Sequence, residues 1–202
     1  MHVRNGVLAG MAALALAIPA RAAQEPAASS GEPALFDAEG YRAARYRSPI
    51  KADPAPAAVI DISAALALEP GRDALFIDVM PAEGGLRDPV SGVWRLTREH
   101  LTIPGALWFP ETGRAPVDTE LWQALEAAIG EARLAAPDQP VILFCRTDCW
   151  MSWNAARRLA RAGVGNVHWL AEGTDGWHAA GRTLVTAVPV AVPAARILQQ
   201  EH

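Results

Sequence analysis

The sequence predicts an α/β protein in which a central parallel sheet is flanked by helices on both faces. Three observations support this fold class. Short apolar runs alternate along the chain with segments of helical periodicity, the order expected of a parallel sheet. The run Ala74–Val79 (ALFIDV) is continuous rather than alternating, as in strands that are buried on both faces. The most strand-like run, Val141–Phe144 (VILF), leads through a loop into a helix that starts near Ser152.

The first elements of the fold are expected from residue 60 onward. Ile60–Leu68 (IDISAALAL) is typical of a short helix capped by Asp61 or Ser63, whose side-chain oxygens accept hydrogen bonds from the free N–H groups of a first turn. After the strand Ala74–Val79 comes the turn Ile103-Pro104-Gly105, and a second strand, Ala106–Phe109, follows it directly.

The second half of the predicted domain contains the longer helices. Apolar residues of Asp118–Leu134 fall on one helical face, and Asp118 is suited to cap the N-terminus. Gly163 stands where a glycine would end the helix that starts near Ser152. The remaining expected elements are the strand Val167–Leu170 and the helix Asp175–Ala180.

The N-terminus has the layout of a secretory signal peptide. Its short start carries Arg4, an apolar stretch follows, and the small-residue triplet Ala20-Arg21-Ala22 predicts cleavage before Ala23. The apolar stretch is shorter than the roughly 20 residues that span a bilayer, although an uncleaved anchor is the alternative. We therefore expect a periplasmic protein with no membrane segment after cleavage.

The whole chain is expected to contain one domain with tails. The leader is small, polar and rich in Pro, whereas Phe36–Pro54 mixes aromatic and Arg residues and is expected to be an arm that packs along the domain edge. The expected segments are a signal peptide (1–22), a flexible leader and arm (23–57), an α/β domain (58–183) and a C-terminal tail (184–202).

The charge of the chain argues against nucleic acid and anionic membranes as partners. The formal net charge is −4, and loss of Arg4 and Arg21 with the signal peptide makes it −6. Lys and Arg form no block along the sequence, so an electrostatic footprint for phosphates is not expected.

The loop after Val141–Phe144 carries the candidate chemistry. Ligand sites of open α/β sheets lie at the carboxyl ends of strands, and Cys145 occupies such an end. We expect the loop to aim several backbone N–H groups at one point, where they and the helix dipole would stabilise a thiolate, a persulfide or a bound oxyanion. Cys149, the only other cysteine, could form a disulfide with Cys145 if their Cα atoms lie within about 7 Å.

Several motifs in the same order resemble the rhodanese family. Ile77-Asp78-Val79 resembles its first-strand "DVR" signature, Ile103–Ala106 its "HIPGA" turn, and Val141–Thr147 its strand and active-site cysteine loop. The resemblance extends over about residues 60–181. It implies a rhodanese-like fold in which Cys145 is the nucleophile and carries a persulfide, with Arg146 beside it.

A narrower resemblance rests on Gly40-Tyr41-Arg42, Tyr46–Pro49 and above all Asp148–Ala156 (DCWMSWNAA). These segments are similar to the PQQ-dependent catabolism-associated CXXCW-motif proteins. That likeness implies a role in alcohol oxidation by pyrroloquinoline quinone enzymes, with a periplasmic quinoprotein dehydrogenase system or a sulfur donor or acceptor as partner. Three residues rather than two separate Cys145 from Cys149 here, which is a departure from the motif.

The cysteine loop also departs from that of sulfurtransferases. Asp148 stands in the place of the glycine and Trp150 in the place of the second Arg, while Met151 stands where a rhodanese-fold phosphatase needs its Arg. A thioether cannot make the bidentate phosphate contact of a guanidinium, so phosphatase activity is not expected. The residues expected to form the substrate loop are Thr147, Asp148, Trp150, Met151 and Ser152.

Three functions compete on these observations. The leading hypothesis is sulfur transfer through a Cys145 persulfide. The second is a thiol–disulfide redox protein in which Cys145 attacks and Cys149 resolves. The third is a non-catalytic module that binds a periplasmic partner through the apolar mouth of the cysteine loop and the arm segment Tyr41–Pro49. A metal held by the cysteines with His168 or His178 is disfavoured by the spacing, so neither a metal nor any cofactor beyond the persulfide is expected.

Overall fold

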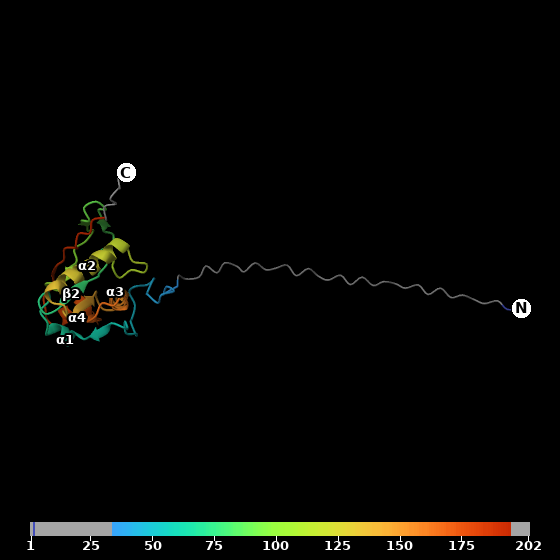
Figure 1. Cartoon of the computed structure of the whole chain (residues 1–202), viewed down its shortest axis with the longest axis horizontal. Helices are drawn as coiled ribbons and strands as arrows, with labels where there is room; N and C mark the ends of the chain where they lie inside the picture. The colour runs from blue at the N-terminus through green and yellow to red at the C-terminus, as the bar shows by residue number, and fades with distance from the viewer. Residues whose placement is uncertain (1, 3–33, 195–202) are drawn as a thin grey trace. The chain divides into compact units, whose positions relative to one another are not determined.

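The computed structural model describes residue 2 and residues 34–194 (Figure 1). Apart from His2, the expected signal peptide and the leader up to residue 33 lie outside the described residues, as does the end of the expected tail from residue 195.

The centre of the fold is a five-stranded sheet in the order β1-β8-β7-β2-β6, and every neighbouring pair is parallel. This confirms the predicted α/β class with a central parallel sheet. The middle strand, β7, and its neighbour β2 are buried along their whole length, as their continuous apolar sequences predict. The strands are β1 (Ala58–Ile60), β2 (Leu75–Asp78), β6 (Leu107–Trp108), β7 (Val141–Phe144) and β8 (Val167–Leu170).

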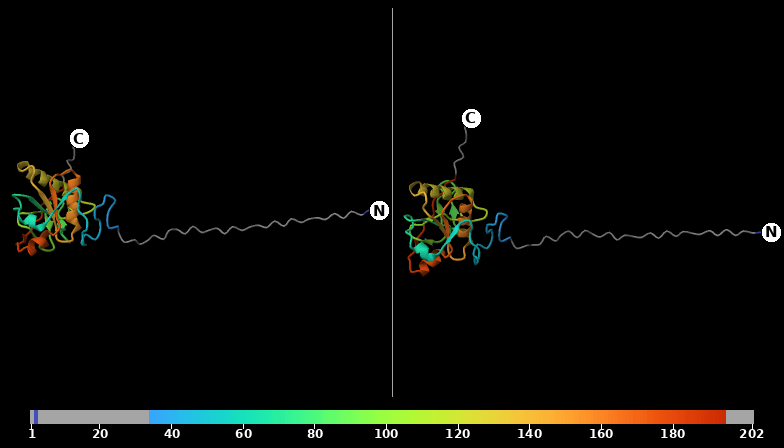
Figure 2. Two further views of the ribbon diagram at one scale, coloured as in Figure 1. Left: turned by 90° about the horizontal axis from the view of Figure 1, so that it is seen from below. Right: turned by 60° about the horizontal axis from the view of Figure 1, so that its bottom comes forward.

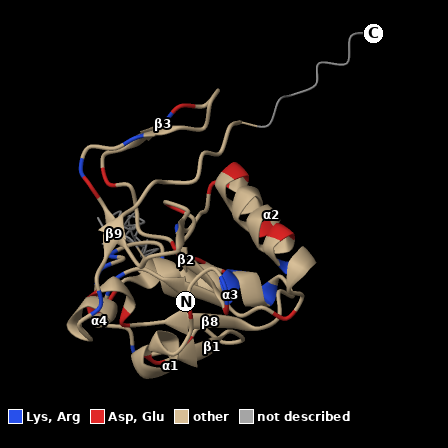
Figure 3. Cartoon of the chain, turned by 90° about the vertical axis from the view of Figure 1, so that its left-hand side faces the viewer, with Lys and Arg blue, Asp and Glu red and all other residues tan. Residues whose placement is uncertain are grey.

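Helices cover both faces of the sheet, as Figures 2 and 3 show. Because successive side chains of a strand point to opposite faces, Ile77 packs in one core cluster and its neighbour Phe76 in another. The cluster of Ile77 includes side chains of α2 and α3, and that of Phe76 includes side chains of α1 and α4. The helices are α1 (Ile62–Leu66), α2 (Thr119–Ala135), α3 (Trp150–Arg161) and α4 (Gly173–Ala179).

Capping side chains and a glycine mark the ends of these helices much as the sequence predicts. Asp61 accepts a hydrogen bond from the Ala64 amide at the start of α1, and Asp118 does the same for Leu121 at the start of α2. Gly163, at φ +88°, ends α3 in the left-handed conformation that glycine tolerates best.

Three boundaries differ from the sequence expectation. Residue Ile60 ends β1 instead of starting a helix, because Val59 and Ile60 pair with β8 in an extended conformation. Helix α3 begins at Trp150 rather than near Ser152, and α4 begins at Gly173 rather than at Asp175. The cysteine loop is therefore shorter than expected, and Trp150 belongs to the first helical turn.

Two small antiparallel pairs lie beside the main sheet and were not expected. Strands of two residues carry too little pattern to show a period. Part of the expected tail takes part in one of them, and further along Pro189 bridges to Trp108 of β6. The pairs join β3 (Leu86–Arg87) to β4 (Trp94–Arg95) and β5 (Leu101–Thr102) to β9 (Val185–Thr186).

Candidate active site

The two cysteines form a disulfide at the carboxyl end of the sheet. Cys145 follows the last residue of β7, Cys149 is the N-cap residue of α3, and their Cα atoms are 6.1 Å apart. Both are buried, at 1% and 3% exposure. Of the alternatives that the sequence leaves open for this pair, the structure contains the disulfide, and the described residues include no free cysteine.

The three residues between the cysteines form a tight turn. Asp148, which stands in the place of the rhodanese glycine, adopts a left-handed conformation at φ +58°, which Asp tolerates better than most residues. The Thr147 amide donates to the Asp175 carboxylate at 3.1 Å, and its carbonyl accepts from the Arg47 guanidinium at 2.7 Å. The turn is thus fixed by α4 on one side and by the N-terminal arm on the other.

The arm runs antiparallel to this loop and covers it. The Trp150 amide, the first of α3, donates to the carbonyl of Tyr46 at 2.8 Å, and the Ser48 amide donates to the carbonyl of Asp148 at 3.0 Å. The N–H groups of Thr147 and Trp150 therefore have separate protein partners and do not converge on one point as expected. The reason is the arm, whose packing the sequence pattern leaves undefined.

The remaining residues of the expected substrate loop are buried and mostly contact other protein groups. Trp150 is 5% exposed rather than open to stacking, and its ring nitrogen donates to the Ser48 hydroxyl at 3.0 Å. Ser152 accepts a hydrogen bond from the ring nitrogen of Trp169 at 3.0 Å. Met151 is buried but lines a cavity beside Cys149.

That cavity, of about 340 Å³, is bordered by several cations and by one acid, Glu83. Burial, and next the positive charge of Arg146, lower the pKa of Arg47. Arg47 and Arg146 therefore line the same cavity as two like charges that repel each other. The lining residues are Arg45, Tyr46, Arg47, Met80, Pro81, Glu83, Arg114, Arg146, Cys149 and Met151.

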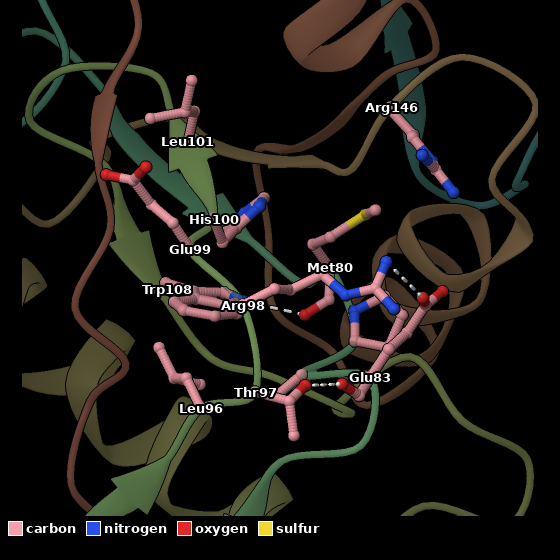
Figure 4. Close-up of a pocket in the computed structure, with 12 residues that line it drawn as sticks. Met80, Glu83, Leu96, Thr97, Arg98, Glu99, His100, Leu101, Trp108 and Arg146 are labelled. Atoms are coloured by element: carbon pink, nitrogen blue, oxygen red, sulfur yellow. Dashed lines mark hydrogen bonds and ion pairs between the residues drawn. The ribbon is translucent and has the colours of Figure 1, made fainter.

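A second cavity, of about 200 Å³, shares Met80, Pro81, Glu83 and Arg146 with the first (Figure 4). Met80 lies between His100 and Arg146 in this view. Its thioether sulfur is 3.1 Å from the Cys145 sulfur, so Met80 separates Cys145 from the second cavity.

Asp78 sits at the carboxyl end of β2, next to the end of β7, and is fully buried. Its carboxylate accepts hydrogen bonds from the Thr102 hydroxyl at 2.6 Å and from the Met80 amide at 2.8 Å, and lies 2.7 Å from His100 Nε2. The sequence motif Ile77-Asp78-Val79 includes Asp78, whereas no motif marks His100, which lies in the loop before β5. Because a buried carboxylate needs hydrogen-bond donors, the position of Asp78 at the end of a buried strand was the signal for a polar partner such as His100.

Within the described ranges, no group of three or more His, Cys, Asp and Glu side chains is arranged to hold a metal ion. Each helix among the same residues is too short or too polar to cross a bilayer. His168 lies 2.9 Å from the Asn166 side chain, and His178 belongs to α4.

The fold and the site together define an α/β protein with a cysteine at the end of a central parallel strand, in the loop that leads into a helix. The chain belongs to the rhodanese family, since the family model described as "Rhodanese-like domain" matches residues 63–180. No curated protein matches the chain.

Solved structures with a similar fold include the thiosulfate sulfurtransferase from Pseudomonas aeruginosa, at 21% identity and a TM-score of 0.45 over 69% of this chain. The chain spans only 22% of that protein. The polysulfide-sulfur transferase from Wolinella succinogenes is 16% identical, with a TM-score of 0.40, over 72% of this chain and 85% of its own. The anaerobic ergothioneine biosynthesis enzyme from Chlorobium limicola is 21% identical, with a TM-score of 0.41, over 71% and 29%.

Proposed function

We propose that this protein is a periplasmic thiol–disulfide redox protein on a rhodanese scaffold, and that it serves PQQ-dependent alcohol oxidation. The observation that carries the redox activity is the disulfide between Cys145 and Cys149 beside a cavity of about 340 Å³. Reduction takes two electrons and two protons from two thiols and leaves both cysteines as thiols. Oxidation of the two cysteine thiols passes two electrons and two protons to a substrate disulfide and forms the bond between Cys145 and Cys149 again.

The loop geometry favours redox exchange over binding of a small sulfur oxyanion. The N–H groups of Thr147 and Trp150, which would help to hold such an anion, donate to Asp175 and Tyr46 instead. The cysteine pair itself needs no such donors, because thiol–disulfide exchange requires only an attacking thiolate and access to one sulfur.

The setting of this activity is proposed from the sequence. The signal-peptide layout of residues 1–22 supports a periplasmic location, where disulfides form and persist. The likeness of Asp148–Ala156 to the CXXCW-motif proteins supports a quinoprotein dehydrogenase system as partner. Loss of the gene should lower PQQ-dependent alcohol dehydrogenase activity in periplasmic extracts, and wild-type protein but not a Cys145→Ala/Cys149→Ala variant should restore it. Restoration by the double variant would instead identify a non-catalytic binding module.

The reduction potential of the pair tests the redox function. Purified protein equilibrated in glutathione buffers and quenched with an alkylating reagent gives the fraction reduced. A value between about −120 and −270 mV, the range of thiol–disulfide oxidoreductases, supports the proposal. A value below about −300 mV identifies a structural disulfide and overturns it.

The second candidate is sulfur transfer through a persulfide on reduced Cys145, favoured by the position of this residue at the end of β7 in a rhodanese-family domain. Reduced protein should then release thiocyanate from thiosulfate and cyanide, with loss of activity in Cys145→Ser and retention in Cys149→Ser. Absence of turnover with thiosulfate, polysulfide or mercaptopyruvate would contradict this candidate.

A further inference from the structure

We propose that Cys149, rather than Cys145, exchanges with the substrate, and that the substrate is an anionic thiol or its disulfide held by Arg47 and Arg146. This inference rests on the proposed redox function and specifies its site. It reverses the order suggested by the sequence, in which Cys145 attacks and Cys149 resolves.

The first argument is access. Cys149 lines the larger cavity together with Met151, whereas Cys145 lines neither of the two cavities beside the disulfide. Met80, which lines both cavities, packs against Cys145 with its sulfur 3.1 Å from the Cys145 sulfur. A thiolate that enters from solvent therefore reaches the Cys149 sulfur first.

The second argument is the position of Cys149 on its helix. Cys149 is the N-cap of α3, a helix of 12 residues whose N-terminus carries partial positive charge. A thiolate at such a position is stabilised, and it is both a good nucleophile and a good leaving group. Both cysteines belong to the same buried apolar cluster, but Cys145 follows the last residue of β7 and does not cap α3, so its thiolate lacks this support.

The third argument is the charge around the cavity. In the described part of the chain neither Arg47 nor Arg146 forms an ion pair, and the Arg146 Nε is buried without a hydrogen-bond partner. The one acid of the cavity, Glu83, lies 3.6 Å from the Arg98 guanidinium outside it. Asp175, Asp148 and Glu83 offset part of the positive charge of Arg47 from a distance. A carboxylate, phosphate or sulfonate on the substrate would pair directly with the two guanidinium groups.

The exchange conserves atoms and electrons. The substrate thiolate attacks the Cys149 sulfur, the bond between Cys145 and Cys149 breaks, and its electron pair passes to Cys145, which takes up a proton. A second substrate thiolate then attacks the mixed disulfide on its substrate sulfur. It releases the substrate disulfide and leaves Cys149 as a thiol after protonation.

Two single variants and two disulfide probes of opposite charge test the inference. Reduced Cys145→Ser protein, which keeps Cys149, should form a mixed disulfide with glutathione disulfide at least tenfold faster than reduced Cys149→Ser protein, as followed by intact mass. In the Cys145→Ser background, glutathione disulfide should react faster than cationic cystamine. Adding Arg47→Met and Arg146→Met should remove that preference, whereas Arg182→Met should preserve it, because Arg182 lines neither cavity.

The outcomes separate this inference from the proposed function. Faster reaction of the Cys149→Ser protein, or a preference for cystamine, would overturn the inference while leaving the redox pair intact. A wild-type disulfide that resists every thiol would instead overturn the proposed function. Cys145→Ala and Cys149→Ala, checked by circular dichroism, replace the serine variants if a buried hydroxyl prevents folding.

Discussion

The side chain of Asn154, in the middle of α3, pairs with the main chain of Arg42 in the arm. Its Oδ1 accepts from the Arg42 amide and its Nδ2 donates to the Arg42 carbonyl, each at 2.9 Å, and Nδ2 also donates to Gly113 O at 2.9 Å. Asn154 is fully buried, so the carboxamide replaces water for three main-chain groups.

Asn154→Ala should therefore destabilise the protein by about 2–4 kcal/mol, because it leaves buried polar groups of the arm without partners. Urea unfolding measures this change. Gln123→Ala, which removes a carboxamide from an exposed position of α2, should change the stability by less than about 0.5 kcal/mol. Equal effects of the two substitutions would show that Asn154 does not hold the arm.

Thr102→Val should cost about 1.5–3 kcal/mol, because the Thr102 hydroxyl donates at 2.6 Å to the buried carboxylate of Asp78. Thr183→Val, at an exposed position, is the matched control. Chemical denaturation measures the free energy of unfolding of both variants. An unchanged stability of Thr102→Val would mean that the Asp78 carboxylate does not need this donor.

Two glycines with positive φ, Gly173 beside the cysteine loop and Gly181 after α4, allow a comparison. A Cβ added at Gly173 would collide with the carbonyl of Cys145, whereas one at Gly181 would meet open space. Gly181→Ala should cost about 1–2 kcal/mol from its backbone conformation alone, and Gly173→Ala about 2–5 kcal/mol. Only Gly173→Ala should also change the rate at which dithiothreitol reduces the disulfide; an unchanged rate would show that α4 does not position Cys145.

Reduction of the disulfide should lower the free energy of unfolding by only about 2 kcal/mol, because the bond closes a loop of just five residues in the chain-entropy description. The protein should stay folded when reduced, as a redox cycle requires. Thermal unfolding with and without dithiothreitol checks this, and unfolding of the reduced protein at 25 °C would contradict it.

His168 should make the protein less stable in acid. Burial lowers the pKa of His168 in the folded protein, so the unfolded chain binds the proton at higher pH. The neutral imidazole stabilises the fold fully above the unfolded pKa of about 6.5, and this contribution is lost as the pH falls from there toward the lower folded pKa. His168→Gln should flatten the pH dependence of urea unfolding between pH 8 and 5; an unchanged profile would assign the acid sensitivity to other groups.

Local pattern was sufficient for the central sheet and the helices but not for the surroundings of the disulfide. The runs Val141–Phe144 and Ala74–Val79 predicted β7 and β2 because strands buried on both faces must be apolar throughout. The contact of Met80 with Cys145 depends on residues 65 positions apart, which no periodicity reports. The pairing of His100 with Asp78 also could not be predicted from periodicity. The sequence indicated only that a buried carboxylate needs partners.

The strand order β1-β8-β7-β2-β6 places the first strand of the central sheet in sequence beside the last one. Ala58 is in register with His168, so β1 has no partner until more than 100 further residues have been synthesised. Contacts between such distant parts of a chain slow folding, because a long loop must close before they form. We therefore expect the polypeptide to remain incompletely assembled until nearly its whole length is available, and to present an unpaired strand to chaperones during that interval.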